Sequence, residues 1–233
     1  MIRHMKLARI IICVLGVLSS SCKLETSSAT PNGNVNANAS ANQTANLNSS
    51  NQPANTNCQL SMAGAPNIKG LKLGMTPDEV LALFPDSKED EEVRKHLSQP
   101  PSQFGVSDFN IHPEKFGSKD KFKDVTQITF NLLDGRVSAF TVGFNGPEYP
   151  HVDQFVAKFI EGTNLPPVDQ WQGYEGMESQ LKMLACKDFE VRVFIGGEGG
   201  KLNYVLMRDL EADRKLKDRK AKARAQASPT PKP

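Results

Sequence analysis

Apolar residues recur at helical and strand spacing between residues 70 and 210, and this pattern predicts an α+β domain. The stretch "GMTPDEVLALFP" predicts a helix that follows Thr76, with Glu79 completing a capping box. A second, more charged helix is expected over "KEDEEVRKHL", capped by Ser87. The apolar stripe of "HVDQFVAKFIEG" predicts a third helix that stops at Gly162.

Alternating apolar residues in "VTQITFNLLDGRVSAFTVGF" predict a β-hairpin. A two-residue Asp-Gly turn pairs Leu132 with Val137 and places the apolar sets of the two strands on opposite faces. A three-residue loop with a left-handed Gly135 pairs Leu132 with Arg136 and places both sets on one face. We expect the longer loop, because register follows the buried face.

The stretch "LKMLACKDFEVRVFI" predicts a second hairpin that turns at Lys187 and Asp188 and keeps Leu184 and Cys186 on the buried face. A last strand is expected in "KLNYVLMRDL". Helices followed by antiparallel strands, twice, predict helices packed on one antiparallel sheet in a single domain over residues 58–210. The expected core includes Val80, Leu83, Phe84, Ile128, Phe130, Phe140, Val156, Phe159, Val191 and Val193.

Residues 1–21 read as a signal peptide, with a basic start, the nine apolar residues 10–18 and three serines. The apolar run is too short for the roughly 20 residues that cross a bilayer. The sequence "LSSSC" resembles the lipobox of bacterial lipoproteins, which implies cleavage before Cys22 and acylation of its thiol. Ser19 departs from that pattern, where Leu, Val or Ile is usual, so secretion without an anchor is the alternative. In that family, Asp directly after the cysteine favours retention at the inner membrane. Lys23 stands at this position, which implies that the protein is placed at the outer membrane.

Residues 22–57 are dominated by Asn, Ala, Ser and Thr. Such a segment buries too little apolar surface to offset the entropy of ordering, so we expect a disordered linker. Its reach as a flexible coil is roughly 33 Å, which suits a leash between a lipid anchor and a domain.

Charge is unevenly distributed along the chain, whose net charge is +2. Residues 211–233 contain eight basic and three acidic residues, and we expect a basic helix followed by a disordered tail. The domain itself is acidic, which argues against a nucleic-acid partner. The basic segment is a candidate for contact with acidic glycans, phosphates or anionic lipid.

The chain has four cysteines, at positions 13, 22, 58 and 186. None forms a CxxC pair or lies near a histidine, so we expect no metal site. Removal of the signal peptide and acylation of Cys22 leave Cys58 and Cys186, which in an exported protein are expected to form a disulfide. The alternative is two independent buried thiols.

No catalytic residue and no cofactor are predicted. "IGGEGGKL" has Ile195 and Leu202 where a phosphate-binding loop needs Gly and Ser or Thr. The histidines at 96, 112 and 151 show no spacing typical of a catalyst or a metal ligand. Trp171 and Tyr174 are candidates for a recognition surface, with burial in the core as the alternative.

The stretch "LKLGMTPDEVLALFP", through Gly74, Thr76, Glu79 and Val80, resembles the helix start of small outer-membrane lipoproteins of the β-barrel assembly family (SmpA/OmlA-like). The wider group includes the β-lactamase-inhibitor-like fold, which repeats helices followed by antiparallel strands. The resemblance implies a role in the assembly or stability of envelope proteins. It carries over no functional residue beyond the cap, and the charged insertion "DSKEDEEVRKHLSQPPSQ" departs from it.

We therefore expect a non-enzymatic lipoprotein of the cell envelope, anchored to the membrane through Cys22, that binds or scaffolds another envelope protein. One alternative is an inhibitor of a secreted or periplasmic enzyme, acting through an open sheet face or the "GGEGG" loop. Another is a hydrolase whose site has no recognisable motif.

Overall fold

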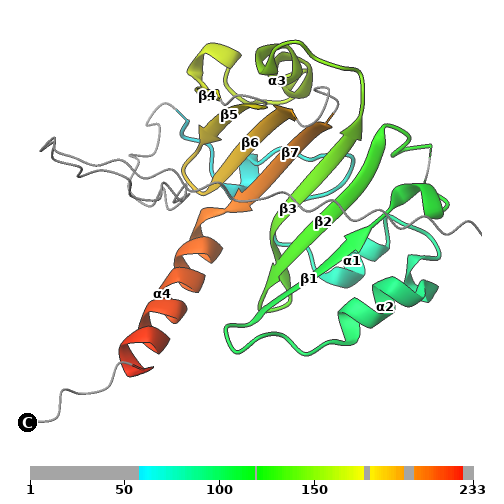
Figure 1. Cartoon of the computed structure of the whole chain (residues 1–233), viewed down its shortest axis with the longest axis vertical. Helices are drawn as coiled ribbons and strands as arrows, with labels where there is room; N and C mark the ends of the chain where they lie inside the picture. Colours follow the sequence, from blue (N-terminus) through cyan, green and yellow to red (C-terminus); the bar gives the residue numbers. More distant parts are fainter. Residues whose placement is uncertain (1–57, 119, 176–178, 197–201, 228–233) are drawn as a thin grey trace, which may run out of the picture. The chain divides into compact units, whose positions relative to one another are not determined.

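The computed structural model describes residues 58–118, 120–175, 179–196 and 202–227 (Figure 1). The predicted signal peptide, Cys22 and the expected linker lie outside these residues, as do most of the "GGEGG" loop and the last six residues.

The described residues form four α-helices and seven β-strands. The helices are α1 (Pro77–Leu81), α2 (Glu91–Ser98), α3 (Val152–Ile160) and α4 (Leu210–Ala227). The strands are β1 (Val106–Ile111), β2 (Val125–Leu133), β3 (Arg136–Asn145), β4 (Gln172–Glu175), β5 (Ser179–Ala185), β6 (Phe189–Gly196) and β7 (Leu202–Asp209).

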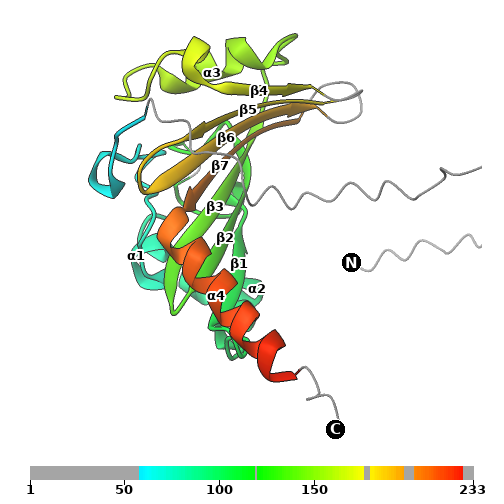
Figure 2. The same cartoon turned by 90° about the vertical axis from the view of Figure 1, so that its left-hand side faces the viewer.

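All seven strands form one antiparallel sheet in the order β1-β2-β3-β7-β6-β5-β4. The last strand, β7, lies between the two predicted hairpins and joins them into one sheet. Helix α3 packs against β5 and β6 (Figure 2). The α+β class, with helices on an antiparallel sheet, is thus confirmed. The sequence reading missed the edge strands β1 and β4.

One row of buried side chains crosses the sheet and forms the centre of the core. Cross-strand neighbours link Phe109, Phe130 and Phe140, with ring centroids 4.8 and 6.2 Å apart. The row continues through Met207, Val191 and Leu184. Most of the expected core is buried, but two of its members, Leu83 and Phe159, are only half-buried.

The turn predicted for the first hairpin is wrong. Leu132 pairs with Val137 across a two-residue turn, in which Asp134 and Gly135 have φ of 53° and 75°. Positive φ at both central residues is typical of a type I′ turn, which matches the twist of the strands. Ser138 is an extra residue on β3, because Asn131 already pairs with Ala139. This β-bulge brings the apolar residues of both strands onto one face, as expected.

The predicted cap of α1 is confirmed, and the predicted cap of α2 is wrong. Thr76 accepts a hydrogen bond from the Glu79 amide, and the Glu79 carboxylate accepts one from the Thr76 amide. Asp90, not Ser87, caps α2, because its carboxylate lies 3.0 Å from the Val93 amide. Ser87 is buried and belongs to a separate 3-10 turn.

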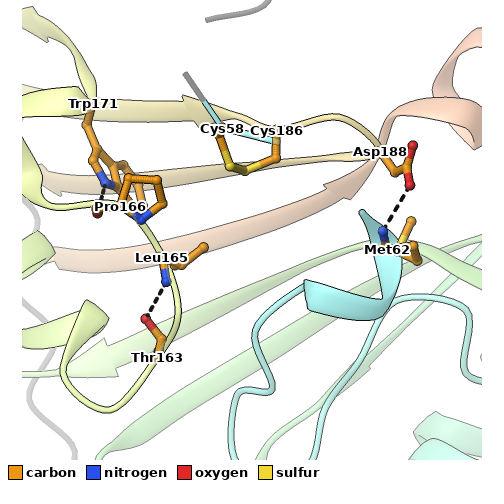
Figure 3. Close-up of a disulfide and its surroundings, with 8 residues drawn as sticks. All are labelled: Cys58, Met62, Thr163, Leu165, Pro166, Trp171, Cys186 and Asp188. Carbon is orange, nitrogen blue, oxygen red and sulfur yellow. Dashed lines mark hydrogen bonds between the residues drawn. A yellow bond between two sulfur atoms is a disulfide. The ribbon is translucent and has the colours of Figure 1, made fainter. Parts of the chain in front are cut away.

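Cys58 and Cys186 form the expected disulfide, with Cα atoms 4.5 Å apart (Figure 3). The bond joins the first described residues to the end of β5. Two hydrogen bonds strengthen the same junction: the Met62 amide donates to the Asp188 carboxylate, and the Lys187 amide donates to the Leu60 carbonyl. Because the two cysteines are 128 residues apart, the disulfide constrains most of the unfolded domain.

The difference in burial between two phenylalanines gives a test of the core. Phe140→Ala removes a fully buried ring from a central strand and should lower the free energy of unfolding by about 3–5 kcal/mol. Phe159→Ala removes a half-buried ring from α3 and should cost clearly less. Urea unfolding of the two variants measures the difference. Equal losses would show that the core is not centred on the row described above.

Candidate interaction surface

The face of β4–β7 that points away from α3 carries a group of apolar side chains, which we call the open face. Cross-strand pairing places Leu181 beside Phe194, and Phe194 beside Tyr204, so the side chains form a continuous row. In the next row of the same face, Met183 and Leu206 lie on either side of Arg192. The open face comprises Tyr174, Leu181, Met183, Phe194, Tyr204 and Leu206.

A glycine in β3 holds the aromatic row in place. Gly143 pairs with Tyr204, and a Cβ atom at position 143 would lie 3.1 Å from the Tyr204 ring. The missing side chain lets the ring lie against the backbone of β3. The Tyr204 ring contacts Phe194, with centroids 6.1 Å apart. The row is therefore positioned by strands rather than by loops, which favours a fixed surface.

The two faces of this half of the sheet differ in burial. On the core face, Val191, Val193 and Val205 are fully buried. On the open face, all six side chains retain solvent exposure, which reaches 37% for Tyr174. Clustered, exposed apolar side chains on a soluble domain are typical of interaction sites.

Charged side chains border the open face at the end of the strands nearest α4. Arg192 donates to Glu190 at 2.7 Å, and Glu190, which is 8% exposed, pairs across the strands with Arg208. An apolar centre with a charged border is the usual composition of a protein–protein interface.

The second feature of note is α4, which is fastened to the β2–β3 turn by what we call the Asp134 latch. The Asp134 carboxylate accepts two hydrogen bonds from Arg219, both 2.8 Å, and one from Lys215 at 2.6 Å. Arg219 also donates to the Phe104 carbonyl at 2.7 Å. Gly105 makes room for the latch, because a Cβ atom there would lie 2.4 Å from the Asp134 carboxylate.

The latch depends on the charge of Asp134. The hydrogen bonds from Arg219, and next the one from Lys215, hold the pKa of the Asp134 carboxyl well below its ordinary value. The carboxylate therefore stays ionised through the whole neutral and mildly acidic range. The contribution of the latch is lost only when the pH falls below the ordinary carboxyl pKa of about 3.9, toward the lowered value.

A cavity of about 290 Å³ lies between the start of α3 and strands β4 and β5. Its polar lining groups bond to one another: Lys182 pairs with Asp153 at 3.1 Å, and the Gln180 side chain accepts from the Val152 amide at 2.8 Å. His151 also lines the cavity. Because these contacts serve to fasten α3 to the sheet, the cavity is a poorer candidate site than the open face.

The structure separates the two aromatic residues that the sequence singled out. Trp171 is buried, and its indole donates to the Pro166 carbonyl at 3.0 Å (Figure 3). Tyr174 lies on the open face instead. The sequence reading missed the rest of that face, although the unbroken apolar run from Tyr204 to Met207 indicated a strand with apolar side chains on both sides.

In the part of the chain that the structure describes, no three His, Cys, Asp or Glu side chains are placed to hold a metal ion. None of the described helices combines the length and apolar character needed to cross a membrane.

No protein-family model and no curated protein matches the chain. A solved structure with limited similarity is that of an extracellular protein containing a SCP domain from Bacillus anthracis str. Ames. It is 10% identical, with a TM-score of 0.31 over 69% of this chain and 51% of that chain. This chain thus spans about half the length of that protein, and a similarity of this size carries no argument about function.

Asp134→Asn tests the latch. The amide keeps the shape of the carboxylate but loses the charge that pairs with Arg219 and Lys215. Hydrogen exchange of the α4 amides at pH 7 should become roughly two- to fivefold faster. Asp218→Asn, at an exposed position of the same helix, should leave exchange unchanged.

The pH dependence of exchange in the wild type gives a second test of the latch. Protection factors of the α4 amides, which are corrected for the pH dependence of intrinsic exchange, should be constant from pH 7 to 5 and fall only below about pH 4. A loss of protection between pH 7 and 5 would contradict the latch.

Proposed function

We propose that this chain is an exported lipoprotein of the cell envelope, anchored through Cys22, and that its domain is a non-enzymatic module that binds another envelope protein through the open face. The open face carries this proposal. One face of the sheet is covered by the core, and the other carries exposed apolar side chains. A partner that covers this second face removes apolar surface from water, which stabilises the complex.

Export is supported by two independent observations. The first 22 residues have the basic, apolar, small and cysteine order of a lipoprotein signal. The domain contains a disulfide between Cys58 and Cys186, and such bonds persist mainly in oxidising compartments outside the cytosol. Placement at the outer membrane rests on Lys23 alone.

Binding is supported by the way in which the open face is built. The side chains Leu181, Phe194 and Tyr204 project from paired strands, so little conformational entropy is lost when they are covered. Tyrosine and phenylalanine are also enriched at interfaces. Inhibition of an envelope enzyme, the alternative role, would use the same face, and the identity of the partner decides between the two roles.

Substitution of Cys22 tests the anchor. Cys22→Ala removes the thiol that would be acylated, so the protein should move from the membrane fraction to the soluble fraction or accumulate with its signal peptide. Intact-mass analysis of the wild type should show an acylated N-terminus at residue 22. An unmodified N-terminus at another residue would contradict the anchor and leave secretion without lipid as the explanation.

Two lysine substitutions on the same sheet face test the binding site. Leu181→Lys places a charge in the centre of the open face and should weaken partner binding by about 10- to 100-fold. Thr129→Lys is the matched control, because it adds the same charge to a half-buried position on the β2 end of that face. Each variant is purified from detergent-solubilised envelopes, and the copurifying proteins are quantified against the wild type. Partners that persist with Leu181→Lys, or that are lost equally with both variants, would contradict the proposal.

A further inference from the structure

The outer side of α4 carries a concentration of positive charge that the open face does not explain. Over its 18 residues the helix has seven basic and three acidic side chains. Its half-buried positions mark the side that faces the domain and are Leu210, Ala212, Asp213, Leu216, Arg219 and Ala223, most of them at helical spacing. The remaining basic side chains are all exposed: Arg214, Lys215, Lys217, Lys220, Lys222 and Arg224.

The Asp134 latch fixes the rotation of α4 about its own axis. Lys215 and Arg219 are held against the β2–β3 turn. Lys217 pairs with Asp213 at 2.8 Å within the helix. The cations of Arg214, Lys220 and Lys222 consequently lie on the outer side and flanks, where no other described element covers them. A fixed helix presents these charges without the entropic cost of ordering a free tail.

The composition of this surface indicates a peripheral electrostatic contact. Besides its basic residues, the outer side of α4 has Ala221, Ala225 and two exposed carboxylates, Glu211 and Asp218, and it lacks large apolar side chains. A helix of this kind does not embed in the acyl region of a bilayer, and its attraction is to anionic headgroups. An 18-residue helix is about 27 Å long, so its charges match an extended anionic surface better than one phosphate group.

We propose that the outer side of α4 binds an anionic membrane surface and thereby holds the domain against the bilayer. A membrane is favoured over a soluble acidic polymer because the exposed cations lie on the outer side and both flanks of a latched helix and face away from the domain, which suits a broad array of headgroups. The proposal does not depend on the open face. It also does not depend on acylation of Cys22, although an anchor there would keep α4 close to the headgroups.

The test is cosedimentation of the chain without its signal peptide, residues 22–233 carrying Cys22→Ser, with vesicles of phosphatidylcholine containing 30% phosphatidylglycerol. The triple variant Arg214→Gln, Lys220→Gln and Lys222→Gln should bind on the order of 100-fold more weakly, since each basic residue near an anionic surface strengthens binding about fivefold. The matched control is Lys72→Gln, Lys95→Gln and Lys123→Gln, three exposed lysines elsewhere on the domain. The control has the same net charge and should bind like the parent chain.

Further outcomes separate this contact from other causes. Binding should disappear on vesicles of pure phosphatidylcholine and fall steeply with added salt, because exposed charges are screened. Equal binding by the α4 variant and the control would overturn the proposal. So would α4-dependent binding to an anionic polysaccharide or to DNA without binding to anionic vesicles. The α4 variant should still retain the partner that Leu181→Lys loses, so failure of one proposal does not imply failure of the other.

Discussion

The β-bulge at Ser138 decides which side of the sheet is buried. The type I′ turn at Asp134 and Gly135 alone would set the apolar residues of β2 and β3 on opposite faces. One extra residue in β3 shifts the register, so that Phe130 and Phe140 become neighbours on the core side. The Ser138 hydroxyl donates to the Asn131 carbonyl at 3.1 Å and closes the bulge. The row from Phe109 to Leu184, and hence the core, depends on this register.

The β2–β3 hairpin also adjoins the two surfaces that the proposals use. Because the core lies on one side of the sheet, the apolar side chains on the other side of β4–β7 stay exposed and are available to a partner. Asp134, held by the turn, receives Lys215 and Arg219 and orients α4. The hairpin thus orients the basic helix proposed to bind headgroups, and through Gly143 of β3 it adjoins the apolar face proposed to bind protein.

Helix caps and hairpins were predictable from the sequence where residues close together in the chain decide them, as in the Thr76 cap and the second hairpin. The sequence reading failed where a choice depended on distant residues. The bulge at Ser138 was missed because it is specified by the pairing of whole strands, and a longer loop was expected instead. The Ser87 cap was wrong because Ser87 is buried beneath α1, which leaves Asp90 to cap α2. The open face was missed because only the strand order, with β7 between β3 and β6, brings its members together.

We propose above that a partner covers the open face in the living cell. Site-specific photocrosslinking tests it most directly, with a benzoylphenylalanine placed at position 174 of the full chain. As a control, the same residue is placed at position 131, which is exposed on the same sheet face but lies in β2, away from the apolar group. A partner on the open face should give a discrete crosslinked protein from position 174 and none from position 131. Crosslinks from position 131 alone, or from neither position, would contradict it.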